Sequence, residues 1–118
     1  MTVTAIDQTI TVQLESDAAR CRAAGIPFNP RLPRDFANTP NDRRPATHHR
    51  WWYRPYIETY TSSPAEPGHE KWIEHWPAGI RYDVRCLDGG AWDRPTCWGM
   101  FATLHEAIHC AQSRKEFA

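Results

Sequence analysis

The chain has 118 residues, which fits one domain, and its hydrophobic fraction of 41% is adequate for a modest core. Its 14 basic and 14 acidic side chains cancel, so the overall charge predicts no class of partner. No apolar stretch approaches the roughly 20 residues that a membrane helix needs, and residues 1–14 lack the features of a signal peptide. The four cysteines include no Cys-x-x-Cys pair, which favours a reducing, cytoplasmic location. A disulfide between Cys86 and Cys97 stays open as an alternative.

The first expected element is a helix over residues 8–24. Apolar side chains recur along this segment at spacings of three and four, namely Ile6, Ile10, Leu14, Ala18 and Cys21. The β-branched run at residues 9–12 disfavours a helix locally. Gly25 stands where a left-handed cap would end it.

Residues 26–50 are predicted to form a long irregular arm. Five prolines interrupt any period of 2 or 3.6 in it, at positions 27, 30, 33, 40 and 45. We expect three apolar residues to attach the arm to the core: Phe28, Leu32 and Phe36.

The segment Trp51–Thr61 reads as a strand, and Pro55 restricts it to an edge of the sheet. Residues 62–68 form a loop rich in proline and serine, and residues 69–76 predict a short helical turn.

The C-terminal part predicts a hairpin followed by a helix. Apolar residues at 80, 82, 84 and 86 alternate with charged ones, a turn begins at Asp88, and residues 96–102 return as a second strand. Thr103 and Glu106 have the spacing of a capping box. The helix that follows has an apolar stripe that would pack on the hairpin, formed by Leu104, Ala107, Ile108 and Ala111.

Together these elements predict an α+β fold for a single domain over residues 1–118, with residues 51–118 forming a sheet of three or four antiparallel strands plus the C-terminal helix.

The pattern Gly-x-Phe-x-Thr-x-x-Glu-Ala at residues 99–107 loosely resembles the arm-binding domains of tyrosine recombinases. The resemblance implies only the strand–turn–strand–helix order. The strands lack the dense lysines and arginines of such DNA-binding domains, so we carry no function over from it.

The most distinctive chemistry is an arginine- and aromatic-rich segment. Residues 20–54 contain eight arginines against two aspartates, a net charge of +6. Arginine, tryptophan and tyrosine dominate binding hot spots. We therefore expect a binding surface made of Arg43, Arg44, Arg50, Trp51, Trp52, Tyr53, Arg54 and Tyr56, together with Trp92 at the hairpin tip. The opposing interpretation is that one of the adjacent tryptophans faces the core, as strand alternation demands.

A second candidate is the sequence His105-Glu106-Ala107-Ile108-His109, which has the form of a helical zinc motif. The two histidines would project about 40° apart on a helix. A third ligand is needed, however; downstream only Glu116 is a plausible donor, and the upstream candidates are His49, His69, Glu70 and His75. We therefore expect no metal and no cofactor, with a zinc-dependent hydrolase or metallopeptidase as the alternative.

The sequence favours a small, non-enzymatic accessory or inhibitor protein that docks on a protein partner. Proteins of bacteria, phages and plasmids often have this size and build. Nucleic-acid binding through the basic arm is the other alternative, although a dedicated nucleic-acid binder is usually more basic than this chain.

Overall fold

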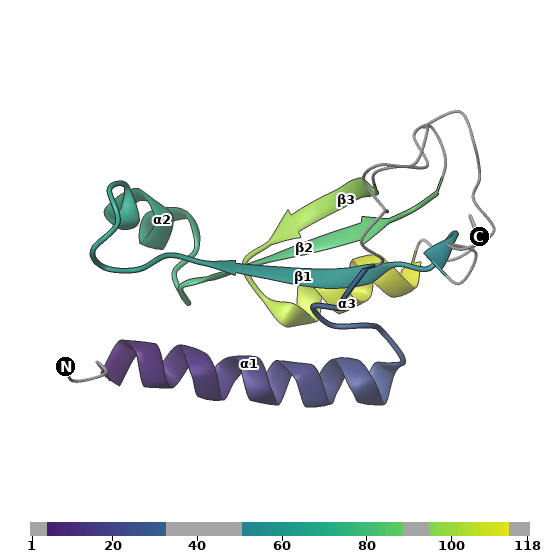
Figure 1. Ribbon diagram of the computed structural model, residues 1–118, viewed down its shortest axis with the longest axis horizontal. Helices are drawn as coiled ribbons and strands as arrows, with labels where there is room; N and C mark the ends of the chain where they lie inside the picture. Colours follow the sequence, from purple (N-terminus) through teal and green to yellow (C-terminus); the bar gives the residue numbers. More distant parts are fainter. Residues whose placement is uncertain (1–4, 33–50, 89–94, 114–118) are drawn as a thin grey trace.

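The computed structural model describes residues 5–32, 51–88 and 95–113. The elements are α1 (Ala5–Ala24), β1 (Tyr56–Thr61), α2 (His69–His75), β2 (Ile80–Cys86), β3 (Thr96–Phe101) and α3 (Leu104–Ser113). The strands form one antiparallel sheet in the order β1-β2-β3 (Figure 1). The fold is α+β, as predicted. None of the helices in the described part could cross a membrane.

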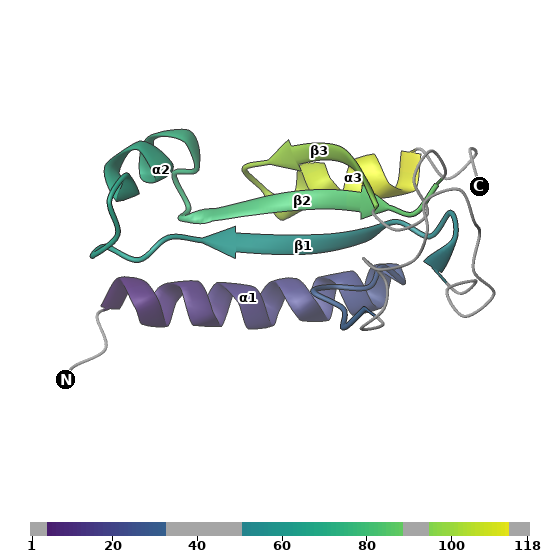
Figure 2. The ribbon, with the colours of Figure 1, turned by 45° about the horizontal axis from the view of Figure 1, so that its top comes forward.

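Helices α1 and α3 pack on the same face of the sheet. The core that they enclose consists of Cys21, Ile26, Ile57, Ile80, Tyr82, Val84, Leu104, Ala107 and Ala111. Helix α1 runs along the length of the sheet, and α2 lies beyond the end of the sheet where β1 stops (Figures 1 and 2). The predicted stripe of α3 therefore packs as expected, with Ile108 against this core.

Helix α1 begins three residues before the predicted start and ends where expected. Gly25 has a φ of 73°, a left-handed conformation that glycine adopts without steric cost. The amide of Gly25 donates to the carbonyl of Arg22 at 3.1 Å, and the amide of Ile26 donates to that of Cys21 at 2.9 Å. These two bonds form a Schellman motif, which satisfies carbonyls at the helix end.

The prediction of a strand from Trp51 onward was wrong for its first five residues, because β1 begins at Tyr56. Tyr53 has a φ of 62°, which an extended strand cannot accommodate. Pro55 then lacks the amide that a ladder requires. β1 is nevertheless an edge strand, as Pro55 predicted.

The start of the Pro-rich arm covers the outer edge of β1. The amide of Ile57 donates to the carbonyl of Pro27 at 3.0 Å, and the amide of Asn29 donates to the carbonyl of Ile57 at 2.7 Å. The side-chain oxygen of Asn29 accepts from the amide of Thr59 at 2.8 Å. Phe28 and Leu32 both pack on buried clusters, as predicted. Residues 33–50, including Phe36, lie outside the described residues.

None of the four cysteines forms a disulfide, so the open alternative of a Cys86–Cys97 bridge is not realised. A register shift between Val84 and Arg85 explains why. It places Cys97 opposite Arg85 and leaves Cys86 opposite Thr96, so the two thiols are on different faces of the sheet.

Candidate functional site

The predicted arginine- and aromatic-rich surface divides into buried and accessible residues. Arg43, Arg44, Arg50 and Trp92 lie outside the described residues. Trp51 is only 8% exposed and Tyr56 is fully buried; they meet edge to face at 5.8 Å in a cluster with Leu87. These two side chains therefore stabilise the fold and present little surface to a partner.

The middle of the segment remains partly accessible. Trp52 and Tyr53 are half-buried, and Arg54 is exposed. The amide of Tyr53 donates to the carbonyl of Leu87 at 2.9 Å, which ties the segment to the end of β2. Trp52, Tyr53 and Arg54 are thus the described members of the predicted surface that a partner could reach.

The sheet itself has a second face, directed away from α1 and α3, which we call the outer face. By strand register it carries the side chains of Tyr56, Glu58, Tyr60, Arg81, Asp83, Arg85, Cys97 and Met100. Trp51 packs against this face at its Tyr56 end. Tyr60, at the other end of β1, is 36% exposed. Met100, which lies opposite Asp83 on β3, is 50% exposed.

A buried carboxylate organises the outer face. Asp83 is fully buried, and its Oδ1 accepts from Nε of Arg81 at 2.7 Å. Its Oδ2 accepts from the Nη2 atoms of Arg81 at 3.0 Å and of Arg85 at 3.2 Å. Two arginines of β2 are thereby held by one acid, and a two-bond contact of this kind fixes the plane of the Arg81 guanidinium.

Aromatic rings hold Arg81 from the side. Its guanidinium carbon lies 4.6 Å from the ring centre of Tyr60 and 5.5 Å from the ring centre of Trp72 in α2. The hydroxyl of Tyr60 donates to Glu58 at 2.7 Å, and this bond is the main reason that the pKa of Tyr60 is raised. The outer face therefore presents an ordered cation framed by aromatic rings.

A second buried carboxylate lies between α1 and β2. Asp17 is fully buried; its carboxylate accepts from the side-chain amide Nε2 of Gln13 at 2.8 Å and from the hydroxyl of Tyr82. Burial, followed by this hydrogen bond, raises the pKa of Tyr82 above its usual range. A small hollow of about 220 Å³ adjoins the pair and is also lined by Arg20 and His105.

The two histidines of the zinc-motif sequence lie on the exposed side of α3. His105 and His109 are both exposed, and with Glu106 they line an open hollow of about 500 Å³. Glu106 is engaged at the helix start: the hydroxyl of Thr103 donates to its carboxylate at 2.9 Å, and the amide of Glu106 donates to that hydroxyl at 3.2 Å. Across residues 5–32, 51–88 and 95–113, no three His, Cys, Asp or Glu side chains are grouped to hold a metal ion.

No protein-family model, curated protein or solved structure matches the chain.

Both buried carboxylates were missed from the sequence, although each had a signal. Asp17 lies three residues after Leu14 and four before Cys21, so it interrupts the apolar face of its own helix. Asp83 alternates with apolar residues along β2, a pattern that by itself predicts a solvent-facing side chain. Arg81 and Arg85, two positions before and after Asp83, indicated that the carboxylate could be paired, since side chains two apart on a strand share a face.

Proposed function

We propose that the chain is a small, non-enzymatic binding module whose partner is a protein. The docking surface joins Trp52, Tyr53 and Arg54 to the accessible part of the outer face, namely Tyr60, Arg81, Arg85 and Met100. The observation that carries the proposal is the guanidinium of Arg81, which Asp83 fixes in place beside the rings of Tyr60 and Trp72.

Order in the unbound state is what makes these side chains suited to binding. Immobilising a flexible side chain at an interface costs about 0.5–1.5 kcal/mol. Arg81 and Arg85 are already restrained by Asp83, so much of that cost is met during folding. Arginine, tyrosine and methionine are also enriched in protein interfaces relative to the rest of the surface.

The charge of the outer face favours a protein over a nucleic acid. Its two arginines are matched by Glu58 and Asp83, and the exposed Arg54 leaves the described docking surface with an excess of only one positive charge. Binding to a phosphate backbone depends on a larger excess. A balanced surface with an exposed methionine is better suited to a partner with a mixed polar and apolar face.

The role of an accessory or inhibitor protein remains part of this proposal, as does a cytoplasmic location. Four cysteines without a disulfide in one small chain support a reducing compartment, because oxidising compartments favour disulfides.

The test begins by immobilising the full chain, identifying enriched proteins by mass spectrometry and purifying the partner for calorimetry. Met100→Glu places a charge on the most exposed apolar side chain of the surface, and we expect the Kd to rise at least tenfold, or about 1.4 kcal/mol. Arg54→Ala should weaken binding in the same direction. Val12→Glu, on the exposed side of α1, is the matched control and should leave the Kd within about twofold.

Normal partner binding by both folded variants would show that the surface is wrongly assigned. A nucleic-acid ligand would reveal itself differently, through an affinity that falls steeply as salt rises. A flat salt response with a protein partner is the result that we expect.

A further inference from the structure

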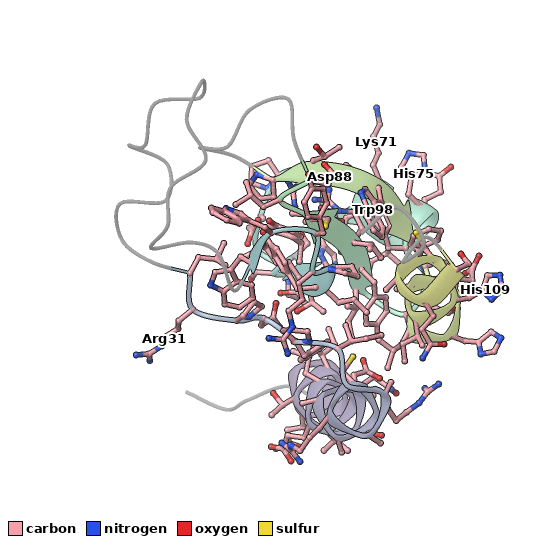
Figure 3. All side chains as sticks on the ribbon, turned by 90° about the vertical axis from the view of Figure 1, so that its right-hand side faces the viewer. Arg31, Lys71, His75, Asp88, Trp98 and His109 are labelled. Atoms are coloured by element: carbon pink, nitrogen blue, oxygen red, sulfur yellow. The ribbon has the colours of Figure 1, made fainter. Side chains whose placement is uncertain are left out.

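Two histidines on α3 remain outside the proposed docking surface. His105 and His109 are one helical turn apart, so their Cβ atoms are about 5–6 Å apart. They line the same open hollow, together with Phe101, Cys110 and Ser113. His109 points away from the body of the molecule in Figure 3. Both rings are therefore accessible from solvent on one side of one helix.

Neither imidazole has a structural partner within the described part of the chain. His69 differs in this respect, because its Nδ1 lies 3.1 Å from the hydroxyl of Ser62. No corresponding hydrogen bond ties His105 or His109 to another described residue. Ring nitrogens that are not engaged in the fold are available as ligands once the rings are neutral.

We infer that His105 and His109 form a two-ligand site for a divalent transition metal on the surface of α3. Neutral imidazole suits nickel, copper and zinc and does not suit magnesium. Two protein ligands leave the remaining coordination positions to water. The site therefore differs from a three-ligand hydrolase centre, and it requires neither Glu106, which caps the helix, nor a distant side chain.

The chemistry of the two ligands predicts an order of metal affinities. Nickel should bind more tightly than cobalt, and magnesium should not bind, in line with the general order for nitrogen ligands. The charged groups near the pair are Glu106 on the same helix and, around the adjoining smaller hollow, Arg20 and Asp17 of α1.

The experiment is calorimetric titration of the full chain with nickel at pH 7.5, in a buffer that does not chelate metals. We expect one ion per chain, and at least a tenfold loss of affinity in each of His105→Ala and His109→Ala. His75→Ala removes an exposed histidine of α2 and Cys97→Ser removes the exposed thiol; both should bind nickel within about twofold of the parent. Circular dichroism checks that every variant is folded.

A second measurement separates this site from adventitious binding. Nickel should raise the Tm of the parent chain and of His75→Ala, because a ligand that binds only the folded state stabilises it. The rise should vanish in His109→Ala. Nickel affinity that survives both α3 substitutions, or that disappears in His75→Ala or Cys97→Ser, would overturn the assignment.

Discussion

At the scale of single residues, burial of ionisable groups is the main feature of this molecule. Asp17 and Asp83 are both fully buried, and each is compensated by at least two hydrogen bonds. A buried charge without such partners would cost several kcal/mol. These carboxylates consequently fix how α1 packs on β2 and how the arginines of β2 are oriented.

Cys21 lies one helical turn after Asp17 and provides a pH-dependent test of this buried region. Burial, with a smaller contribution from Asp17, raises the pKa of its thiol from 9.0 to about 11, and Arg20 acts in the opposite sense. Between these values the unfolded chain releases the thiol proton while the folded chain keeps it. The free energy of unfolding should therefore fall as pH rises from 9 to 11, and the contribution is fully present below pH 9.

Cys21→Ala should flatten that part of the stability curve, measured by urea unfolding at several pH values. The slope lost should be at most about 1.4 kcal/mol per pH unit. Cys97→Ala removes an exposed thiol and serves as the control. Its free energy of unfolding should change with pH at the same slope as that of the parent chain. An unchanged slope in Cys21→Ala would mean that the buried thiol does not keep its proton in the folded state.

At the scale of elements, the unit β2–β3–α3 shows how local chemistry builds the scaffold. Gly99 on β3 lies beneath the ring of Phe101, where a Cβ atom would come within 2.7 Å of the ring. Thr103 then begins α3 through its hydrogen bonds with Glu106. Residues 99–106 thus determine where β3 ends and α3 begins. The start of α3 in turn sets which side of the helix carries His105 and His109.

Thr103→Ala should lower the free energy of unfolding by about 1 kcal/mol, because it removes the side-chain acceptor for the amide of Glu106. Thermal or urea unfolding followed by circular dichroism measures the loss. Ser113→Ala, at the exposed last turn, is a suitable comparison and should change stability by less than about 0.5 kcal/mol. Equal effects of the two substitutions would contradict the assigned cap.

At the scale of the whole molecule, apolar clusters lie on both faces of the sheet. The larger one is enclosed by α1 and α3, and the smaller one joins Trp51, Tyr56 and Leu87. The second cluster explains why only some side chains of the arginine- and aromatic-rich segment are accessible to solvent. Its tryptophan and tyrosine close one end of the outer face and leave Arg54 in solvent.

Trp51→Ala should therefore act on folding. We expect it to lower the free energy of unfolding by about 3 kcal/mol, the lower end of the range for removing a buried aromatic ring. Arg54→Ala, three residues away and exposed, should stay within about 0.5 kcal/mol of the parent. Urea unfolding of both variants checks this, and a Trp51→Ala variant as stable as the parent would place that ring outside the core.

Much of the fold could be predicted because the relevant signals are local. The spacing of apolar residues in α1 and α3, the alternation along β2 and the cap at Thr103 depend on neighbours only a few positions apart. The same signals were weaker between Trp51 and Pro55, where the left-handed conformation of Tyr53 ends any strand. For the candidate site, sequence composition indicated arginine and aromatic chemistry and could not separate the buried rings from the accessible ones.

The chain's periodicity and turn residues were sufficient for the α+β architecture, because backbone conformation responds to short-range sterics and hydrogen bonding. Only the folded arrangement decided that Asp83 would be buried between two arginines, that Trp51 would cover Tyr56, and that Cys86 and Cys97 would occupy opposite faces. Each of these outcomes depends on strand register and on contacts between segments far apart in the chain. Such contacts lower the free energy of the whole structure and leave almost no trace in any one segment.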